Sequence, residues 1–217
     1  MDPQPLVRLD EITRRLRREC PWDREQDERS IVPHTVEEAY ELADAAARGD
    51  DEKLLDELGD VLFQVLFLAL LLEERGAGDL SAVAEGMSAK LIRRHPHVFE
   101  ESEARDLLSG VDPETASGVL RNWDRIKREV EGRGGDDPFA DVPENLPALL
   151  YARKLLRRAD PDDGSPPRDD TQARDAAEAW VGELLLAAVG LARRLGVDPE
   201  LALRAAADRY REAASRD

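Results

Sequence analysis

The sequence predicts an all-α fold, and three observations lead to that prediction. Ala, Leu, Arg, Glu and Asp dominate the 217 residues, whereas aromatic residues make up only 5%. β-Branched residues are scarce as well, and such a mixture favours helices over strands. Apolar residues recur at helical spacing, and clusters of Gly, Pro and Asp separate the periodic stretches. We therefore expect a bundle of helices.

The first helix is expected over residues 5–19. Its apolar face carries Leu6, Leu9, Ile12 and Leu16. Pro21 should end this helix, because a proline disfavours helical backbone in the residue before it. We expect residues 23–34 to be irregular. Thr35 is then predicted to cap the next helix, with Glu38 completing a capping box.

Three further helices are expected before residue 95. One runs over about 36–48 and stops at Gly49, and a second begins near residue 51 and ends near Gly76. The second contains the longest apolar run, which is too short and too polar to span a bilayer and indicates a buried helix. Gly59 lies within it, and a close helix contact would explain a glycine there. A third helix is expected over about 80–94.

The C-terminal half is predicted from weaker patterns. The expected elements are a short helix within 100–118, helices over 118–131 and 148–158, a break at 159–170, and two last helices over 171–195 and 199–214. We expect three parts: a first helical domain over 1–131, a linker with a short helix over 132–170, and a further helical region over 171–217.

Charge and cysteine content narrow the function classes. The formal net charge is −17, and such a field repels polyanions, so binding of duplex nucleic acid is not expected. Cys20 is the single cysteine, so no disulfide can form within the chain, which suits a reducing cytosol. The N-terminus lacks the apolar stretch of a signal peptide. The sequence thus predicts a cytoplasmic protein that is not bound to a membrane.

Two acidic pairs carry the chemistry that the sequence suggests. Glu38 and Glu41 lie three residues apart on one predicted helix, and Glu57 and Asp60 lie three apart on the next. Residues at this spacing share a helical face. A short connection around Gly49 makes the two helices antiparallel neighbours, so both acidic faces can point into one space.

Converging carboxylates repel one another unless a cation lies between them. Oxygen ligands without a Cys/His cluster favour Mg²⁺ over zinc. Magnesium held by carboxylates usually retains waters and recruits substrate phosphates, which points to phosphate-ester or anhydride chemistry. Spacing alone is weak support, because acidic residues at this interval are common on solvated helix faces.

Four sequence blocks raise the specificity of this interpretation. TVEEAYE (35–41) and ELGDVLF (57–63) carry the two acidic pairs, CPWDREQ (20–26) precedes them, and RRHPHVF (93–99) follows. Together, in this order and spacing, they resemble the MazG family of nucleotide pyrophosphohydrolases over about residues 6–158. The resemblance implies an all-α, MazG-like helical bundle that forms a homodimer.

The resemblance also implies an activity and its residues. The expected reaction is Mg²⁺-dependent hydrolysis of nucleoside triphosphates to monophosphate and pyrophosphate, in nucleotide-pool house-cleaning, with Mn²⁺ as a possible substitute metal. The matching metal ligands and catalytic acids are Glu38, Glu41, Glu57 and Asp60. The matching substrate-binding residues are Glu37, Lys53, Lys90, Arg94, Trp123 and Lys127.

For the predicted substrate-binding residues, a role in ligand binding and a purely structural role are both physically reasonable. Lysine and arginine side chains can neutralise a triphosphate, and an indole can stack on a base. Against this, Lys53 and Lys90 could simply be solvent-exposed, and Trp123 could pack in the core. Trp22 is predicted to anchor the core or a loop, Cys20 to be buried, and the two histidines around Pro96 to form a helix stop.

The last region departs from the family pattern. Two-domain relatives carry a second copy of the fold, and residues 184–210 resemble the end of that copy. Trp180 and Glu183 fall where the copy should provide Glu and Asp, so we expect a degenerate second region without a metal site. Three alternatives to the enzyme remain: a non-catalytic nucleotide-binding regulatory module, a dUTPase-like or phosphoribosyl-ATP hydrolase of the same bundle, and a purely structural helical protein.

Overall fold

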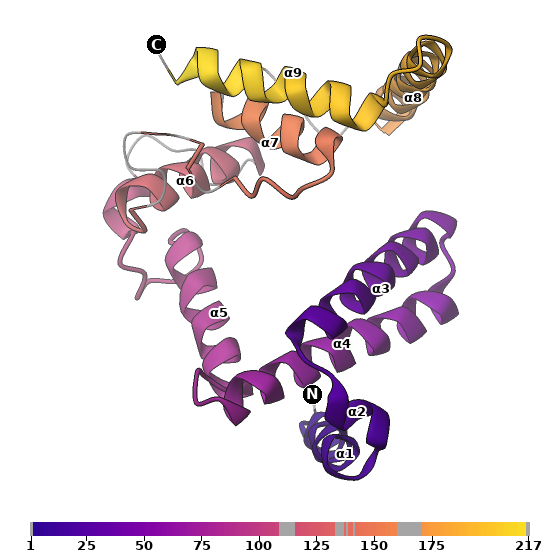
Figure 1. Ribbon diagram of the computed structural model, residues 1–217. Helices are drawn as coiled ribbons and strands as arrows, with labels where there is room; N and C mark the ends of the chain where they lie inside the picture. The colour runs from indigo at the N-terminus through magenta and orange to yellow at the C-terminus, as the bar shows by residue number, and fades with distance from the viewer. Residues whose placement is uncertain are drawn as a thin grey trace. The chain divides into compact units, whose positions relative to one another are not determined.

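The structure is a computed structural model, and it describes residues 2–108, 116–132, 137, 139–140, 142–159 and 171–215. Within these ranges the chain is helical and contains no strand, which confirms the predicted all-α class (Figure 1). The elements are α1 (Gln4–Glu19), α2 (Pro21–Glu25), α3 (Glu28–Arg48), α4 (Asp51–Glu74), α5 (Leu80–Arg94), the 3₁₀-helix η1 (Arg105–Leu108), α6 (Ala116–Glu129), α7 (Ala148–Ala159), α8 (Thr171–Arg194) and α9 (Pro199–Ala214).

The chain divides into two compact units, Met1–Lys90 and Leu91–Asp217. The first contains α1 to α4 and most of α5, and the second contains the end of α5 and all later helices. Our division at residues 131 and 170 remains a prediction. The contacts of each unit nevertheless show what positions its functional side chains.

The entry into α3 differs from the sequence prediction. Residues 23–34 are not irregular, because α2 occupies Pro21–Glu25 and α3 already begins at Glu28. The cap is Asp27, whose carboxylate accepts a hydrogen bond from the Ser30 backbone N–H at 2.9 Å, while the Ser30 hydroxyl lies 2.9 Å from the Asp27 N–H. Thr35 instead donates its hydroxyl to the Ile31 carbonyl, one turn back within the helix. The predicted capping box at Thr35 is therefore wrong.

Pro33 misled the prediction, because an interior proline removes one helical hydrogen bond and normally breaks a helix. Here the helix runs through it. The Asp27 capping box stabilises the first turn, and Ile31 is buried against Phe67 and Leu71 of α4. The packing of this first turn offsets the hydrogen bond that is lost at Pro33. Such packing between helices cannot be predicted from the residue pattern of one helix.

Replacing Asp27 with alanine should lower the free energy of unfolding by about 1 kcal/mol, the usual cost of losing an N-cap side chain. Thr35→Ala is the matched comparison. It removes only a local bond from a hydroxyl to a carbonyl inside the helix, so we expect a much smaller change. Chemical denaturation of both variants measures the difference, and a larger loss for Thr35→Ala would restore the cap predicted from sequence.

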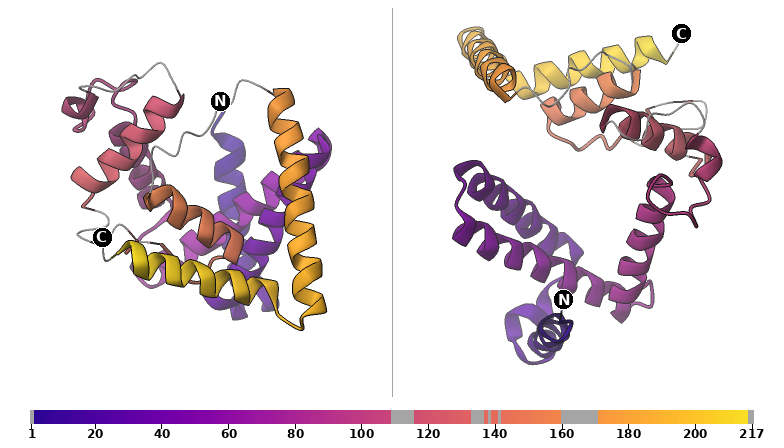
Figure 2. Two further views of the ribbon diagram at one scale, coloured as in Figure 1. Left: turned by 90° about the horizontal axis from the view of Figure 1, so that it is seen from above. Right: turned by 180° about the vertical axis from the view of Figure 1, so that it is seen from behind.

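α3 and α4 form an antiparallel hairpin, and the two helices lie side by side in Figure 1 and in the right-hand view of Figure 2. Gly49 joins them in the left-handed conformation, with φ of 66°, which glycine adopts without steric cost. Asp50 then caps α4 by accepting a hydrogen bond from the Lys53 N–H at 3.0 Å. The predicted hairpin is thus confirmed, and its local chemistry explains the sharp turn.

The N-terminal helix is tied to the hairpin by two arginines. Arg14 binds Glu73 at 2.7 Å and Arg17 binds Glu74 at 2.8 Å, so α1 is held against the end of α4. The Arg17 guanidinium also donates to the Asp23 and Gln26 carbonyls at 2.5 and 3.0 Å. The segment CPWDREQ (20–26) is therefore held against α1 through two of its backbone carbonyls.

The second unit has its own apolar core around α7 and α9, which lie side by side (Figures 1 and 2). Tyr151 and Leu155 of α7 pack with Ala207 of α9 and with two loop residues, Phe139 and Val142. The Tyr151 hydroxyl donates to Asp208 at 3.0 Å, and Arg204 donates to the Glu144 and Leu146 carbonyls. The loop before α7 is therefore fixed to α9.

Most other helix predictions are confirmed within two residues of the observed ends. Gly59 is an exception, because a Cβ atom there would meet nothing within 4 Å among the described residues, so the predicted close contact is wrong within this chain. Cys20 is only partly buried, and Trp22 is exposed, with its ring 6.2 Å from that of His34. The predicted break at 159–170 lies, except for its first residue, outside the described residues.

Candidate metal and substrate site

The hairpin brings the predicted acidic residues together. Carboxylate oxygens of Glu38, Glu41 and Glu57 lie within 4.8 Å of one another, and oxygens of Asp56, Glu57 and Asp60 form a second such group. Glu57 belongs to both groups, so it lies at the centre of the acidic cluster. The spacing argument therefore identified the cluster correctly. It missed Asp56, one turn before Asp60 on α4 and thus on the same side of the helix.

Burial and charge show how unfavourable this cluster is by itself. Glu57 is only 1% exposed, and its Oε2 atom is buried without a hydrogen-bond partner among the described residues. Burial raises the pKa of Glu38, and the neighbouring charges of Asp60, Glu41 and Glu57 raise it further. Such a group of oxygen donors fits a hard divalent cation, which would relieve both the repulsion and the unpaired oxygen.

Lys53 lies beside the cluster and partly neutralises it. Its ammonium group forms an ion pair with Glu57 and lies 3.2 Å from Asp56. The contact with Glu57 is the main reason that the pKa of Lys53 is raised. In the metal-free chain, one turn of α4 thus supplies its own cation to the buried carboxylate. This pairing could not be read from the lysine alone, because a lysine four residues before a glutamate is ordinary on exposed helices.

Replacing Lys53 with methionine should lower the unfolding temperature of the metal-free protein, because the buried Glu57 carboxylate loses its cation. Saturating Mg²⁺ should restore much of the difference, since a bound divalent cation would supply the missing charge. Lys53→Arg keeps the charge and is the control. Thermal unfolding with EDTA and with Mg²⁺ measures both effects, and a Mg²⁺-independent loss would contradict this account.

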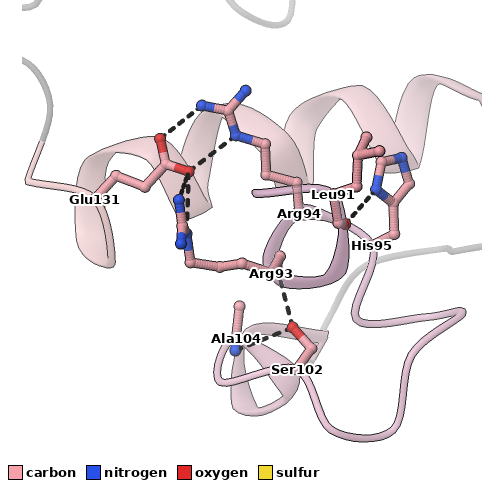
Figure 3. Close-up of polar contacts among 7 residues, drawn as sticks. All are labelled: Leu91, Arg93, Arg94, His95, Ser102, Ala104 and Glu131. Carbon is pink, nitrogen blue, oxygen red and sulfur yellow. Dashed lines mark hydrogen bonds and ion pairs between the residues drawn. The ribbon is translucent and has the colours of Figure 1, made fainter. Parts of the chain in front are cut away.

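The basic end of α5 forms a second polar cluster (Figure 3). Arg94 binds Glu131 through two hydrogen bonds, from Nε at 2.9 Å and from Nη2 at 2.6 Å, and Arg93 binds the same carboxylate at 2.8 Å. These bonds, chiefly those from Arg94, lower the pKa of Glu131 to about 2. Sequence reasoning selected Arg94 but missed Glu131, which lies 37 residues further along the chain.

The ion pairs of Glu131 with Arg93 and Arg94 should make the free energy of unfolding depend on pH in the acid range. The pKa is about 2 in the folded protein and near 4.5 ordinarily, so the contribution is complete above pH 4.5 and is lost as pH falls toward 2. A pKa shift of this size corresponds to roughly 3 kcal/mol in the free energy of unfolding. Acid titration of unfolding in wild type and Glu131→Gln should show two curves that converge near pH 2. Curves separated by a constant offset would contradict this effect.

Trp123 of α6 lies in an aromatic and polar setting. Its ring meets the His95 ring edge-on at 5.0 Å, and His97 lies 5.7 Å from His95. The Trp123 Nε1 atom is buried and has no hydrogen-bond partner among the described residues. His95 follows the last residue of α5, with Nδ1 2.6 Å from the Leu91 carbonyl. The histidines thus do follow a helix end, as predicted.

The remaining predicted residues differ in exposure. Glu37 is exposed on α3, 3.8 Å from the His34 ring nitrogen. Lys90 on α5 and Lys127 on α6 are partly buried, so the alternative that Lys90 is simply solvent-exposed is not supported. In the described part of the chain, no helix is both long and apolar enough to cross a bilayer.

Comparison with known proteins decides the family. A family model described as the MazG nucleotide pyrophosphohydrolase domain matches residues 26–99. The nucleoside triphosphate pyrophosphohydrolase of Escherichia coli is 39% identical over 229 residues, which cover 94% of this chain and 84% of that protein. The chain belongs to the MazG family. The resemblance carried by the four sequence blocks is thereby confirmed.

Two further relatives match over most of the chain. The Thermotoga maritima protein named nucleoside triphosphate pyrophosphohydrolase/pyrophosphatase MazG is 34% identical over 209 residues, covering 89% of this chain and 76% of its own. An uncharacterised 26.1 kDa protein of Streptomyces cacaoi is 39% identical over 213 residues, which cover 96% of this chain and 80% of that protein. The MazG model spans the whole acidic cluster and extends through Arg94, so the family match includes the hairpin that carries the site.

Proposed function

We propose that this MazG protein hydrolyses nucleoside triphosphates to nucleoside monophosphate and pyrophosphate with Mg²⁺ as its cofactor. The observation that carries the proposal is the buried Glu57, shared by two groups of converging carboxylates. A carboxylate buried among like charges is unfavourable, and the ion pair with Lys53 offsets only part of that cost, so a bound divalent cation would stabilise the cluster. The names of the relatives supply the substrate class.

The side chains of the hairpin would divide the work as follows. Glu38, Glu41, Glu57 and Asp60 would hold the metal, which when bound would supply Lewis-acid chemistry at the α-phosphate and favour deprotonation of the attacking water. Glu38 or Glu41 would accept the proton of the attacking water. The water oxygen forms a bond to the α-phosphorus, and the bond from that phosphorus to the bridging oxygen breaks. Lys53 would stabilise the charge on the leaving pyrophosphate.

The other substrate-binding residues remain part of the proposal. Lys90 and Arg94 would bind phosphate oxygens, and Lys127 would add charge near the nucleotide. Trp123 would stack on the base, which suits a site that accepts several bases. Glu37 would orient a ligand of the metal cluster. We further propose a homodimer, a cytoplasmic house-cleaning role and Mn²⁺ as a substitute cofactor. Exposed apolar residues of α4, Leu55 among them, are compatible with burial in a dimer.

Hydrolysis in ¹⁸O-labelled water tests the reaction. Attack at the α-phosphorus places the label in the monophosphate and releases pyrophosphate in equal amount. Each triphosphate should be assayed with Mg²⁺, with Mn²⁺ and with EDTA, and Asp60→Asn should be the inactive control. Orthophosphate with nucleoside diphosphate as the product would overturn the proposal. Nucleotide binding without turnover would instead support a regulatory module.

A further inference from the structure

One carboxylate holds two consecutive arginines in the second unit, and this arrangement is more than a surface ion pair. Glu131 accepts from Nε and Nη2 of Arg93 at 3.1 and 2.8 Å, and from the same two atoms of Arg94 at 2.9 and 2.6 Å. The Glu131 side chain is 6% exposed, against 27% for Arg93 and 17% for Arg94. The carboxylate is therefore buried beneath the two guanidinium groups.

The backbone around the cluster is fixed on both sides. The Glu131 N–H donates to the Ile126 carbonyl at 3.1 Å, which ties it to the end of α6. The Ser102 hydroxyl donates to the Arg93 carbonyl at 3.1 Å, which ties the end of α5 to the following loop (Figure 3). These two bonds fix the backbone on either side of the cluster, and the hydrogen bonds to Glu131 orient the guanidinium groups themselves. The guanidinium groups are thus held in one orientation before any ligand arrives.

The bonding pattern leaves donors for an anion. Both bonds from Arg94 use the Nε–Nη2 edge (Figure 3). No hydrogen bond or ion pair from Nη1 is found among the described residues. The three groups together carry one surplus positive charge. A guanidinium can bind a phosphate through its remaining N–H groups, and a fork that is already oriented loses less entropy on binding. The geometry suits phosphate binding by an arginine whose other edge is fixed.

Arg94 is better suited to this role than Arg93. Arg94 lies one turn after Lys90 on α5, so the two share a helical face, whereas Arg93 is turned about 100° away from Arg94 around the axis. Arg94 also makes the shortest bond to Glu131, 2.6 Å, and engages both carboxylate oxygens. Arg93 binds only Oε1. Glu131 therefore constrains Arg94 more tightly than it constrains its neighbour.

We propose that Glu131 is a positioning residue, which orients Arg94 so that its Nη1 edge binds a phosphate oxygen of the substrate. This inference rests on the proposed function, in which Arg94 binds phosphate. Glu131 itself would not touch the nucleotide. Without the Glu131 carboxylate, Arg94 would stay charged but its side chain would be mobile. Each binding event would then include the entropy cost of ordering that side chain.

Binding of an α,β-methylene nucleoside triphosphate with Mg²⁺, measured by calorimetry, tests the proposal without turnover. Glu131→Gln keeps the shape of the side chain and removes its charge, and we expect the Kd to rise about tenfold. In an Arg94→Ala background the same Gln substitution should have no further effect on Kd. Arg93→Ala is the matched control, because it removes the other partner of Glu131, and its Kd should stay within about twofold of wild type.

Several outcomes would overturn the positioning role: an unchanged Kd in Glu131→Gln, additive effects of the Gln and Arg94→Ala substitutions, or an equal loss in Arg93→Ala. If Glu131→Gln does not fold, Glu131→Asp is the second variant, since it keeps the charge on a shorter side chain. We expect its Kd to rise less than tenfold. An unchanged Kd in folded Glu131→Asp would likewise overturn the positioning role. A wild-type protein that binds the analogue but releases no pyrophosphate from the natural triphosphate would contradict the proposed function alone. Wild-type affinity in Arg94→Ala would contradict this inference and the phosphate-binding role of Arg94, but not the proposed hydrolysis reaction.

Discussion

Replacing Asp60 with asparagine should lower kcat for pyrophosphate release roughly a thousandfold, because several kcal/mol of metal-assisted stabilisation of the transition state would be lost. Asp60 is exposed at the edge of the cluster, so the substitution should not disturb the core. Its charge helps to raise the pKa of Glu38. The metal-free variant should therefore unfold at a higher temperature than wild type, since one repelling charge is gone.

The same variant should lose the rise in unfolding temperature that Mg²⁺ gives the wild type. Asp44→Asn is the matched control. Asp44 lies one turn beyond Glu41 on α3, exposed and paired with Arg48 at 2.9 Å, outside both carboxylate groups. Its kcat and Mg²⁺ response should match wild type within experimental error. An Asp60→Asn enzyme that retains most of its activity would exclude Asp60 from the metal site.

Replacing Phe67 with alanine should lower the free energy of unfolding of the first unit by about 3–5 kcal/mol, the usual cost of deleting a buried aromatic ring. Phe67 is 0% exposed, packs with Ile31 and Leu71, and meets the Phe63 ring at 5.9 Å. The Arg17 guanidinium lies 5.7 Å from the ring centroid. Removing the ring therefore affects α1, α3 and α4 together.

Phe67→Leu is the control for that experiment, since it keeps most of the apolar volume and should cost about 1 kcal/mol. Urea denaturation measures both variants. Because α3 and α4 carry the acidic cluster, the alanine variant should also show weaker Mg²⁺ binding at temperatures near its transition. A loss below 1 kcal/mol for Phe67→Ala would mean that the hairpin does not depend on this cluster of apolar residues.

The helices that could be predicted from the sequence are those whose patterns are long and locally consistent. The periodic apolar residues of α1, the uninterrupted apolar run of α4 and the Gly49 stop could be read directly, because each depends on neighbours within a few turns. The acidic pairs could also be read, since their spacing fixes the shared face and a short turn fixes the direction of the second helix. The family blocks then supplied the chemistry.

Features that depend on contacts between distant residues could not be predicted in this way and are seen only in the folded chain. α3 continues through Pro33 because packing against α4 offsets a local penalty that sequence rules treat as decisive. Glu57 is the central acid of the four because the hairpin buries it, which spacing cannot show. Glu131 meets Arg94 only because the end of α6 returns to the end of α5. Local patterns specify helices and their faces, whereas burial and long-range pairing arise only when those faces meet.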